Sequence, residues 1–191
     1  MDIQKVEIIH SLENINTLIQ TQINQSKRQR QQVLFLTRIV ITVIAIYLLL
    51  TFVFGISVLN GNSMNPTLSN GDVSLYFRLD RDYKSGDIVL FRSFSTQEIL
   101  VKRIVAGPGD TITIVDGKVF VNNSILKEPY IFSQTPDRGE VDYPLTLGKD
   151  EFFVLGDNRD TSMDSRSAEI GVVNKKYIKG KIIATFRFGN H

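Results

Sequence analysis

The chain of 191 residues has no cysteine and only two histidines, His10 and His191. The absence of cysteine excludes disulfides, thiol nucleophiles and thiolate metal sites. The two histidines stand at opposite ends of the chain, so neither is placed to serve as the base of a Ser-His-Asp triad in the region between them. A serine nucleophile in this chain therefore needs another base.

Charge is uneven along the chain, although the net charge is only +2. Residues 1–38 contain five basic and three acidic side chains, residues 39–59 contain none, and residues 60–191 contain 17 of each sign. The long C-terminal segment is thus neutral overall, and an isoelectric point near 8.8 gives no support to a nucleic-acid-binding surface. We expect no nucleic-acid partner.

Residues 39–59 form an uncharged apolar run of 21 residues. As an α-helix this run spans ~31 Å, about the thickness of one hydrocarbon core. It is too long for the apolar part of a cleaved signal peptide, and no A-x-A cleavage site follows it. Four basic residues precede it: Lys27, Arg28, Arg30 and Arg38. The positive-inside rule therefore predicts a single-pass anchor in the cell membrane, with residues 1–38 in the cytoplasm and residues 60–191 outside it.

Residues 1–32 have the pattern of a polar helix with a thin apolar stripe, formed by Ile8, Leu12, Ile15 and Ile19. Their spacing of four, three and four residues keeps them on one face. The pattern covers barely two heptads, which is shorter than a coiled coil requires. We expect a cytoplasmic helix that lies on the membrane or on its own anchor, with a partner helix or disorder as alternatives.

After residue 60 the sequence changes to short runs of β-branched and aromatic residues bounded by Gly, Asp or Asn. Seven such runs are present: residues 75–79, 87–93, 99–105, 111–115, 118–122, 151–156 and 181–188. Asp116-Gly117 predicts a two-residue hairpin, and Asn122-Asn123 predicts a second one. Helical periodicity occurs only near residues 171–180. The pattern predicts a mainly β fold, an antiparallel barrel-like or orthogonal sheet domain behind a single N-terminal transmembrane helix.

A serine, Ser63, stands just beyond the apolar run, three residues before Pro66. Such a pair is typical of a turn, because proline fixes φ and keeps the preceding residue out of the α region. If Ser63 is a nucleophile, a lysine can serve as its base once burial lowers the lysine pKa. Of the nine lysines after the anchor, Lys102 alone lies inside an apolar strand, with Leu100 and Ile104 on its own face. Its spacing fits a buried base and an edge-strand lysine that discourages aggregation equally well.

Residues 156–166 follow an apolar strand and are rich in charged and amide side chains. These groups need mutual pairing if they are buried. A calcium-binding loop does not fit, because its required glycine and glutamate fall on Ser162 and Ala168. Residues 106–110 are rich in glycine but lack the Lys-Ser/Thr of a phosphate-binding loop, so we interpret them as a tight turn.

Three motifs, in this order behind an anchor, resemble the bacterial type I signal peptidases: residues 63–67, 102–110 and 156–166. The resemblance covers roughly residues 39–188 and implies a Ser/Lys dyad, with Ser63 as nucleophile and Lys102 as general base. It also implies that Ser162 hydrogen-bonds to the Lys102 amine and orients it. Supporting roles are implied for six more residues: Asp164 and Arg166 as an ion pair, with Asp157, Asn158, Arg159 and Arg103 as scaffold. Gly61 stands where some members carry a serine, so backbone N–H groups, chiefly that of Ser63, are implied as oxyanion donors.

The same resemblance implies secretory preproteins as substrates, bound as an extended strand and cleaved after small residues at positions −3 and −1. We expect Met64 and the apolar residues near Val101 to line the pockets for these side chains. The lipid bilayer is the other expected partner, and neither a metal nor a cofactor is expected. One competing interpretation is a non-catalytic paralogue that binds preproteins or pilin-like substrates as an assembly factor, although such a binder has no chemical need of Ser63 or Lys102. Another is a self-cleaving repressor with the same dyad, which would need a DNA-binding domain where residues 1–59 form an anchor.

Overall fold

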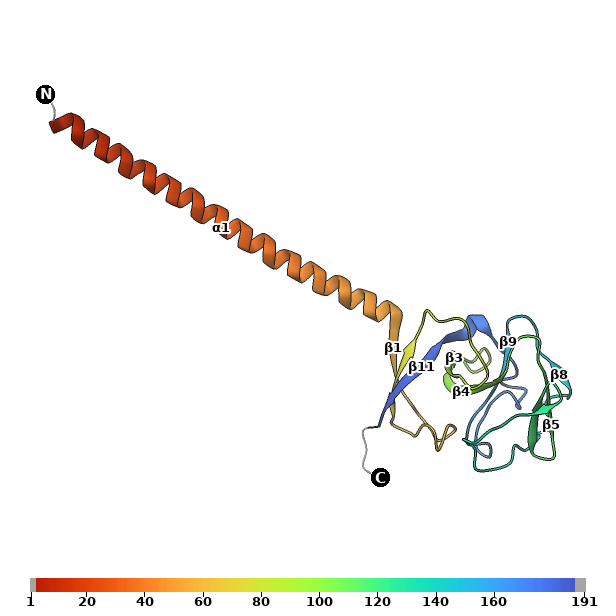
Figure 1. Ribbon diagram of the computed structural model, residues 1–191. Helices are drawn as coiled ribbons and strands as arrows, with labels where there is room; N and C mark the ends of the chain where they lie inside the picture. Colours follow the sequence, from red (N-terminus) through yellow and green to blue (C-terminus); the bar gives the residue numbers. More distant parts are fainter. Residues whose placement is uncertain (1–2, 188–191) are drawn as a thin grey trace. The chain divides into compact units, whose positions relative to one another are not determined.

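The computed structural model of the protein describes residues 3–187 (Figure 1). Phe188 and His191, which the sequence analysis named, lie outside the described residues. The chain divides after Leu50 into a helical unit and a β-rich unit.

A single continuous helix, α1 (Ile3–Val53), runs through the N-terminal segment and into the apolar run. Because residues 1–32 continue directly into the anchor, the expected packing of this segment on its own anchor is wrong. Residues 13–53 contain the one stretch of helix in the described chain that is long and apolar enough to cross a membrane, with a mean hydropathy of 2.6 in its apolar window. No part of that window is buried within the protein, so this is not a core helix. A helix with exposed apolar side chains all round fits a lipid environment.

The helix ends at Val53, so the expected helical anchor over residues 39–59 is wrong at its C-terminal end. The next residues form strand β1 (Phe54–Val58). This segment combines aromatic and β-branched residues with Gly55, a composition that favours strand over helix. Glycine also permits a close approach, because a Cβ at Gly55 would lie 2.2 Å from the Tyr76 ring of the neighbouring strand. The backbone groups of β1 therefore find partners in strand β2 instead of a last helical turn.

Seven antiparallel strands form the main sheet, in the order β1-β2-β11-β3-β4-β9-β10. Beyond β1, their bounds are β2 (Val73–Phe77), β3 (Ile88–Arg92), β4 (Ile99–Ala106), β9 (Glu151–Leu155), β10 (Val173–Asn174) and β11 (Ile178–Phe186). The register of β11 shifts at two places, as in a β-bulge, and such irregularities bend a strand. The sheet curls so far that β1 and the start of β4 line one hollow, although three strands separate them in the sheet order.

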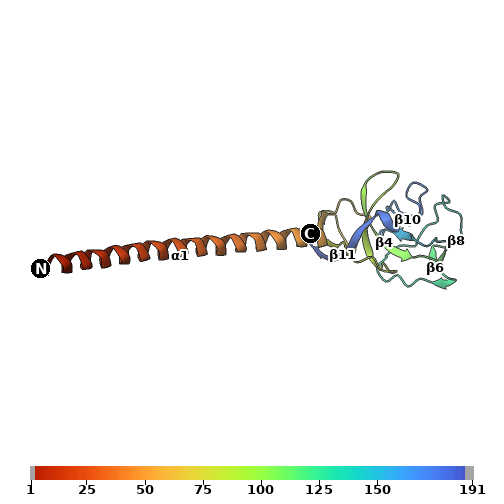
Figure 2. The same cartoon turned by 90° about the horizontal axis from the view of Figure 1, so that it is seen from above.

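A second sheet has four strands in the order β7-β6-β5-β8, and it lies at the end of the β-rich unit away from β1 (Figure 1, Figure 2). Its strands are β5 (Thr111–Val115), β6 (Lys118–Val121), β7 (Ser124–Ile125) and β8 (Leu145–Thr146). Asp116 and Gly117 turn β5 into β6 with φ of 49° and 71°, and Asn122 and Asn123 turn β6 into β7 with φ of 51° and 63°. Both predicted hairpins are confirmed.

Each of the seven runs predicted as strands overlaps a strand of the structure, and the predicted mainly β, antiparallel fold class is confirmed. The sequence did not predict β1, which is hidden in the apolar run, or the two-residue strands β7, β8 and β10. Residues 171–180, where the sequence has helical periodicity, contain only a short 3₁₀ turn, η1 (Lys175–Tyr177), between β10 and β11.

Strands β4 and β9 are covered on both faces, which explains their nearly unbroken apolar sequences. On one face Ile104 and Val154 pack with side chains of β3 and β11. On the other face Val105 packs with side chains of β5 and β6. The same alternation sends the neighbouring residues Lys102 and Arg103 of β4 to opposite faces of the sheet.

Candidate active site

Ser63 lies in the loop that connects β1 to β2. The base of this loop is closed by a hydrogen bond from the Leu59 N–H to the Asp72 carbonyl, at 2.9 Å. Two further apolar side chains of the loop, Met64 and Leu68, are buried in one cluster with Leu59. The loop's own apolar residues therefore fix the backbone on both sides of the serine.

Lys102 extends from β4 to this serine, and its Nζ lies 2.7 Å from Ser63 Oγ. The lysine is only 3% exposed. Burial lowers the pKa of Lys102 to about 8, and the carboxylates of Asp164 and Asp157 act in the opposite direction without cancelling this effect. Because the amine is buried against a hydroxyl, the alternative interpretation of Lys102 as a solvated edge-strand lysine is wrong.

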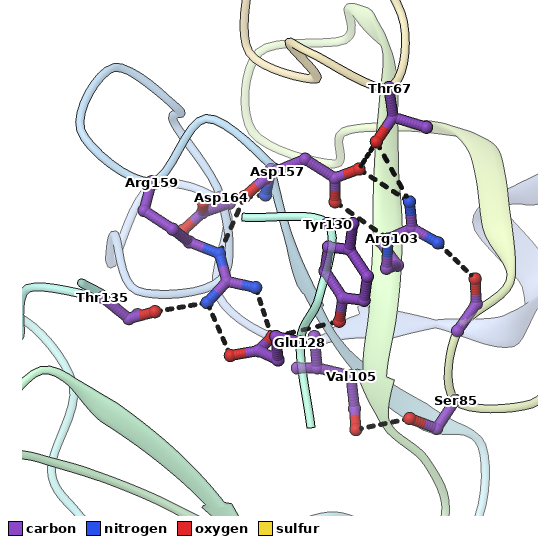
Figure 3. A network of polar contacts seen from close by, with 12 residues as sticks. Thr67, Ser85, Arg103, Val105, Glu128, Tyr130, Thr135, Asp157, Arg159 and Asp164 are labelled. Atoms are coloured by element: carbon purple, nitrogen blue, oxygen red, sulfur yellow. Dashed lines mark hydrogen bonds and ion pairs between the residues drawn. The ribbon is translucent and has the colours of Figure 1, made fainter. Parts of the chain in front are cut away.

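Arg103, on the other face of β4, is held by the Asp157 carboxylate (Figure 3). Its Nε and Nη2 donate to the two carboxylate oxygens at 2.8 and 2.6 Å. Its Nη1 donates to the Gly86 carbonyl at 2.8 Å, and the guanidinium lies over the Tyr130 ring at 4.0 Å from the ring centre. This arginine thereby ties β4 to the loop of residues 156–166.

Arg159 forms a second buried ion pair, which Figure 3 shows beside the pair of Arg103 and Asp157. It is fully buried, and its guanidinium donates to the Glu128 carboxylate and to the Thr135 hydroxyl. Its Nε also donates to the Gly156 carbonyl at 2.9 Å. Sequence reasoning missed Glu128, Tyr130 and Thr135, because they lie in an irregular segment without strand or helix periodicity. The one available signal was that a buried arginine requires a carboxylate.

Asp164 and Arg166 form the ion pair that the sequence resemblance implied, and both are buried. The guanidinium donates from Nε and Nη2 to the two carboxylate oxygens, each at 2.8 Å. Asp164 also accepts the Gly156 N–H at 3.1 Å. Removing one partner of such a buried pair costs about 3–5 kcal/mol, because the other charge is left uncompensated. The pair therefore stabilises the loop that passes behind Ser63.

Ser162 differs from the expectation that its hydroxyl orients the Lys102 amine. Its side chain is fully buried, but the hydroxyl has no hydrogen-bond partner within residues 3–187. The expected hydrogen bond to Lys102 is therefore wrong for this structure. Ser162 packs instead against Gly156, where an added Cβ would lie 2.1 Å from Ser162 Oγ and 2.4 Å from the Ser63 carbonyl oxygen. The absence of a side chain at Gly156 lets Ser162 and the Ser63 backbone pack together.

Asn158 spans the backbone just before the serine. Its side-chain amide donates to the Asn62 carbonyl at 3.1 Å, and its backbone N–H donates to the Ser63 carbonyl at 3.0 Å. Gly61 has φ of +91°, and its N–H donates to Asn70 Oδ1 at 2.9 Å. That N–H is therefore occupied, whereas no acceptor among residues 3–187 takes the Ser63 N–H.

A hollow of about 160 Å³ opens beside Ser63 and Lys102. Its lining includes Met64 and Val101, as the sequence predicted, together with residues of β1. A cavity of about this size admits one benzene-sized group. Two backbone edges border it, because the described β1 pairs only with β2, and β4 pairs with β9 only from Arg103 onward.

A buried lysine amine against a serine hydroxyl, beside a groove with free strand edges, is the arrangement that a serine hydrolase with a lysine base requires. Among residues 3–187, no three His, Asp or Glu side chains gather into a group that could hold a metal ion. The contact between Lys102 and Ser63 makes this a candidate site for acyl transfer by the chain's own side chains.

The chain belongs to the signal peptidase family, peptidase S26, whose family model matches residues 32–187. It is a type I signal peptidase and thus a serine peptidase, and the resemblance drawn from the three motifs is confirmed. The N-terminal 31 residues fall outside the matched region.

Two Bacillus relatives agree with this assignment. A signal peptidase I P of Bacillus subtilis subsp. natto is 34% identical over 168 residues, which cover 82% of this chain and 90% of the relative. Signal peptidase I S of Bacillus subtilis strain 168 is 34% identical over 157 residues, 74% of this chain and 82% of the relative. A crystal structure of a signal peptidase I from Enterococcus faecalis matches with a TM-score of 0.46 at 28% identity, covering 53% of this chain and 97% of that one.

Proposed function

We propose that the protein is a membrane-anchored endopeptidase that removes signal peptides from secretory preproteins, with Ser63 as nucleophile and Lys102 as general base. The observation that carries the proposal is the distance of 2.7 Å between Lys102 Nζ and Ser63 Oγ. This distance is within the range that direct proton transfer requires. The substrate class is supported by the names of the relatives, which are signal peptidases.

The reaction begins with Lys102 in its neutral form. The amine takes the Ser63 proton while Oγ attacks the carbonyl carbon of the scissile bond, and the carbonyl oxygen becomes an oxyanion. When this intermediate collapses, the C–N bond breaks, and the Lys102 ammonium gives its proton to the leaving amine, the new N-terminus of the mature protein. A water molecule then attacks the acyl ester, Lys102 takes the water proton, and the Ser63 oxygen leaves and regains its hydrogen.

The Ser63 N–H is the donor that we assign to the oxyanion. It has no acceptor among residues 3–187, so it is available for the developing charge. The Gly61 N–H is another backbone donor of the same loop. Because it already donates to Asn70, we assign it no direct contact with the oxyanion.

Substrate binding is proposed along the free edges of β1 and the first half of β4. An extended peptide can add to such edges by main-chain hydrogen bonds, while its alternate side chains enter the hollow beside Ser63. The hollow is only about 160 Å³, which favours small side chains at positions −1 and −3. Met64 and Val101 form part of the wall that limits side-chain size.

The remaining charged residues of the motifs are proposed as positioning residues. The Arg103–Asp157 and Asp164–Arg166 pairs fix residues 156–166 against β4 and against the serine loop. Arg159 adds a third buried link, to Glu128. Asn158 holds the two backbone carbonyls around Ser63, and Ser162 fills the space behind it.

The protein is localised to a membrane by α1, and its orientation is part of the proposal. We place residues 1–38 in the cytoplasm and the catalytic domain, from residue 60 onward, outside it, because the basic residues cluster on the N-terminal side of the span. The uncharged helical segment, residues 39–53, covers only ~22 Å. Including the uncharged residues 33–37, of which four are apolar, extends it to ~31 Å, with Arg38 close enough to the cytoplasmic end to reach the headgroups.

Ser63→Ala tests the proposed chemistry most directly. Detergent-solubilised full-length protein is incubated with a preprotein, and the new N-terminus is sequenced. Loss of the nucleophile should lower turnover by many orders of magnitude while leaving preprotein binding intact. Ser57→Ala is the matched control, because Ser57 lines the same hollow and has no hydrogen bond with Lys102 among the described contacts. Near-normal turnover of Ser63→Ala would exclude the dyad.

A further inference from the structure

A second hollow, of about 240 Å³, lies within the β-rich unit, which begins at Thr51 and includes the last three residues of α1. Four cations line it: Arg78, Arg81, Lys176 and Lys179. Phe52 and Leu79 form an apolar part of the lining, and their side chains are 70% and 52% exposed. This hollow shares no lining residue with the hollow beside Ser63, and the proposed peptidase mechanism uses none of its residues.

The depth of this hollow relative to the membrane follows from the residue at which the membrane-crossing helix ends. Phe52 is the penultimate residue of the membrane-crossing helix, which ends at Val53. The Val53 carbonyl accepts the Arg78 N–H at 2.9 Å, so the cationic lining begins directly at the end of the span. A hollow that contains the last turn of a membrane helix lies at the boundary between acyl chains and headgroups, whatever angle the helix takes.

The strands bring the other cations to the same place. β11 pairs with β2 so that Lys181 is opposite Phe77, which brings Lys179 alongside the residues that follow β2. Lys176 lies in the short turn η1 just before β11, and Arg81 lies just after β2. Positive charges that are distant in sequence are thereby collected around one hollow.

None of the four cations has a carboxylate partner among the described residues. The nearest acidic residues in sequence, Asp80 and Asp82, are engaged elsewhere. Asp80 accepts the Asp82 N–H at 3.0 Å, and Asp82 pairs with Lys84 at 3.1 Å. Among residues 3–187, the one polar partner of the Arg78 guanidinium is the nearby Tyr76, through its ring and hydroxyl. All four cations are exposed and available to an anion.

We propose that this hollow binds the headgroup of an anionic phospholipid of the adjacent leaflet. The phosphodiester would contact the four cations, and the upper acyl chain would lie against Phe52 and Leu79. A free anion would leave the apolar part of the lining without a contact. An acidic peptide would have to displace the lipid that surrounds the end of the membrane helix. A phospholipid matches both parts of the hollow and is already present at high concentration where the hollow lies.

The test uses the full-length protein in vesicles of phosphatidylcholine and phosphatidylglycerol. The chain has no tryptophan, so Phe52→Trp introduces a single fluorophore into the hollow. Acyl-brominated phosphatidylglycerol in one series, and brominated phosphatidylcholine in a second, quench this tryptophan according to which lipid occupies the site. We expect a several-fold preference for phosphatidylglycerol over phosphatidylcholine.

Arg78→Gln combined with Lys179→Gln removes two cations from the hollow. Each Lys or Arg close to an anionic surface contributes up to about fivefold to binding at low ionic strength, so the two cations together can account for the whole several-fold preference, and neutralising both should abolish it. The matched control is Lys118→Gln with Lys127→Gln, which removes the same charge from exposed positions on and after β6 and should keep the preference. Exchanging the cations, with Arg78→Lys and Lys179→Arg, should also keep it. Equal preference in the neutralised and control variants would overturn the proposal.

A separate arm distinguishes a lipid from a free anion. The Phe52→Trp protein in a non-ionic detergent is titrated with millimolar inorganic phosphate and with sn-glycerol 1-phosphate at constant ionic strength. We expect no saturable change in fluorescence. Saturable binding that Arg78→Gln with Lys179→Gln abolishes would mean that the site takes a soluble phosphate, and the lipid assignment would be wrong. Neither arm depends on cleavage, so its failure is separate from failure of the proposed peptidase activity.

Discussion

The rate of cleavage should follow the neutral fraction of the Lys102 amine. Burial lowers its pKa from 10.5 to about 8. An amine with that pKa is about 10% neutral at pH 7 and about 90% neutral at pH 9, whereas an unperturbed lysine is less than about 0.1% neutral at pH 7. We therefore expect kcat/KM to rise about tenfold from pH 7 to pH 9 along one ascending limb, without the inflection near pH 6.5 that a histidine base produces.

The measurement is kcat/KM between pH 6 and pH 10 for a peptide with small residues at positions −3 and −1, in a non-ionic detergent. Lys102→Arg complements the pH series, because a guanidinium keeps its proton throughout this range. It should be as inactive as Lys102→Ala at every pH. Lys118→Arg is the control, since Lys118 is an exposed residue of β6. A flat profile, a midpoint above pH 10, or appreciable turnover by Lys102→Arg would show that another group is the base.

Three further predictions concern stability, the serine loop and topology. Lys102→Met should raise the free energy of unfolding at pH 7 by about 3 kcal/mol, measured by denaturant titration, because a buried amine with a lowered pKa destabilises the fold. The unfolded chain binds more protons between pH 8 and 10.5, so wild-type stability rises over that window and the advantage of the variant should disappear above it. Gly61→Ser and Gly61→Ala should lower kcat/KM to a similar extent. A side chain at this position meets no atom within 4 Å, but a φ of +91° costs about 1–3 kcal/mol in residues other than glycine. A serine variant more active than wild type would contradict this reasoning and show that an added hydroxyl reaches the oxyanion. Protease added to spheroplasts should digest the domain after residue 60 and spare the N-terminal segment, and a protected domain would contradict the proposed orientation.

Long apolar runs with clear turn residues were predictable from the sequence, because both signals are local. Asp116-Gly117 and Asn122-Asn123 turned where expected, since their side chains tolerate positive φ better than most. The end of α1 was not predictable in the same way. The uncharged run of residues 39–59 contains both the end of α1 and strand β1. Hydropathy does not distinguish the apolar residues of a membrane helix from those of a strand. The pairing of Gly55 with Tyr76 decides the boundary, and that contact is made by a distant part of the chain.

The candidate site shows the same division. Lys102 was identifiable as a candidate base because a lysine inside an apolar strand is rare and costly, although the spacing fitted an exposed edge-strand lysine equally well. Its contact with Ser63 joins residues 39 positions apart, and only the motif resemblance connected them beforehand. Glu128 was not predicted, because no motif or periodicity in the neighbouring sequence indicates its role, although the buried Arg159 requires a carboxylate partner. Ser162 shows the reverse case, since the motif implied a hydrogen bond to Lys102 that the packing around Gly156 does not provide.

The short connection between α1 and Ser63 also limits which peptide bonds the enzyme can reach. Ser63 follows Val53 by ten positions, and a fully extended chain of that length spans at most ~36 Å. Five of these residues form β1, a stiff segment of ~17 Å. If the proposed function is correct, Ser63 can reach only those peptide bonds that lie within a few nanometres of the bilayer surface. The length of the connection would then select substrates by the height of the scissile bond above the membrane, in addition to its sequence.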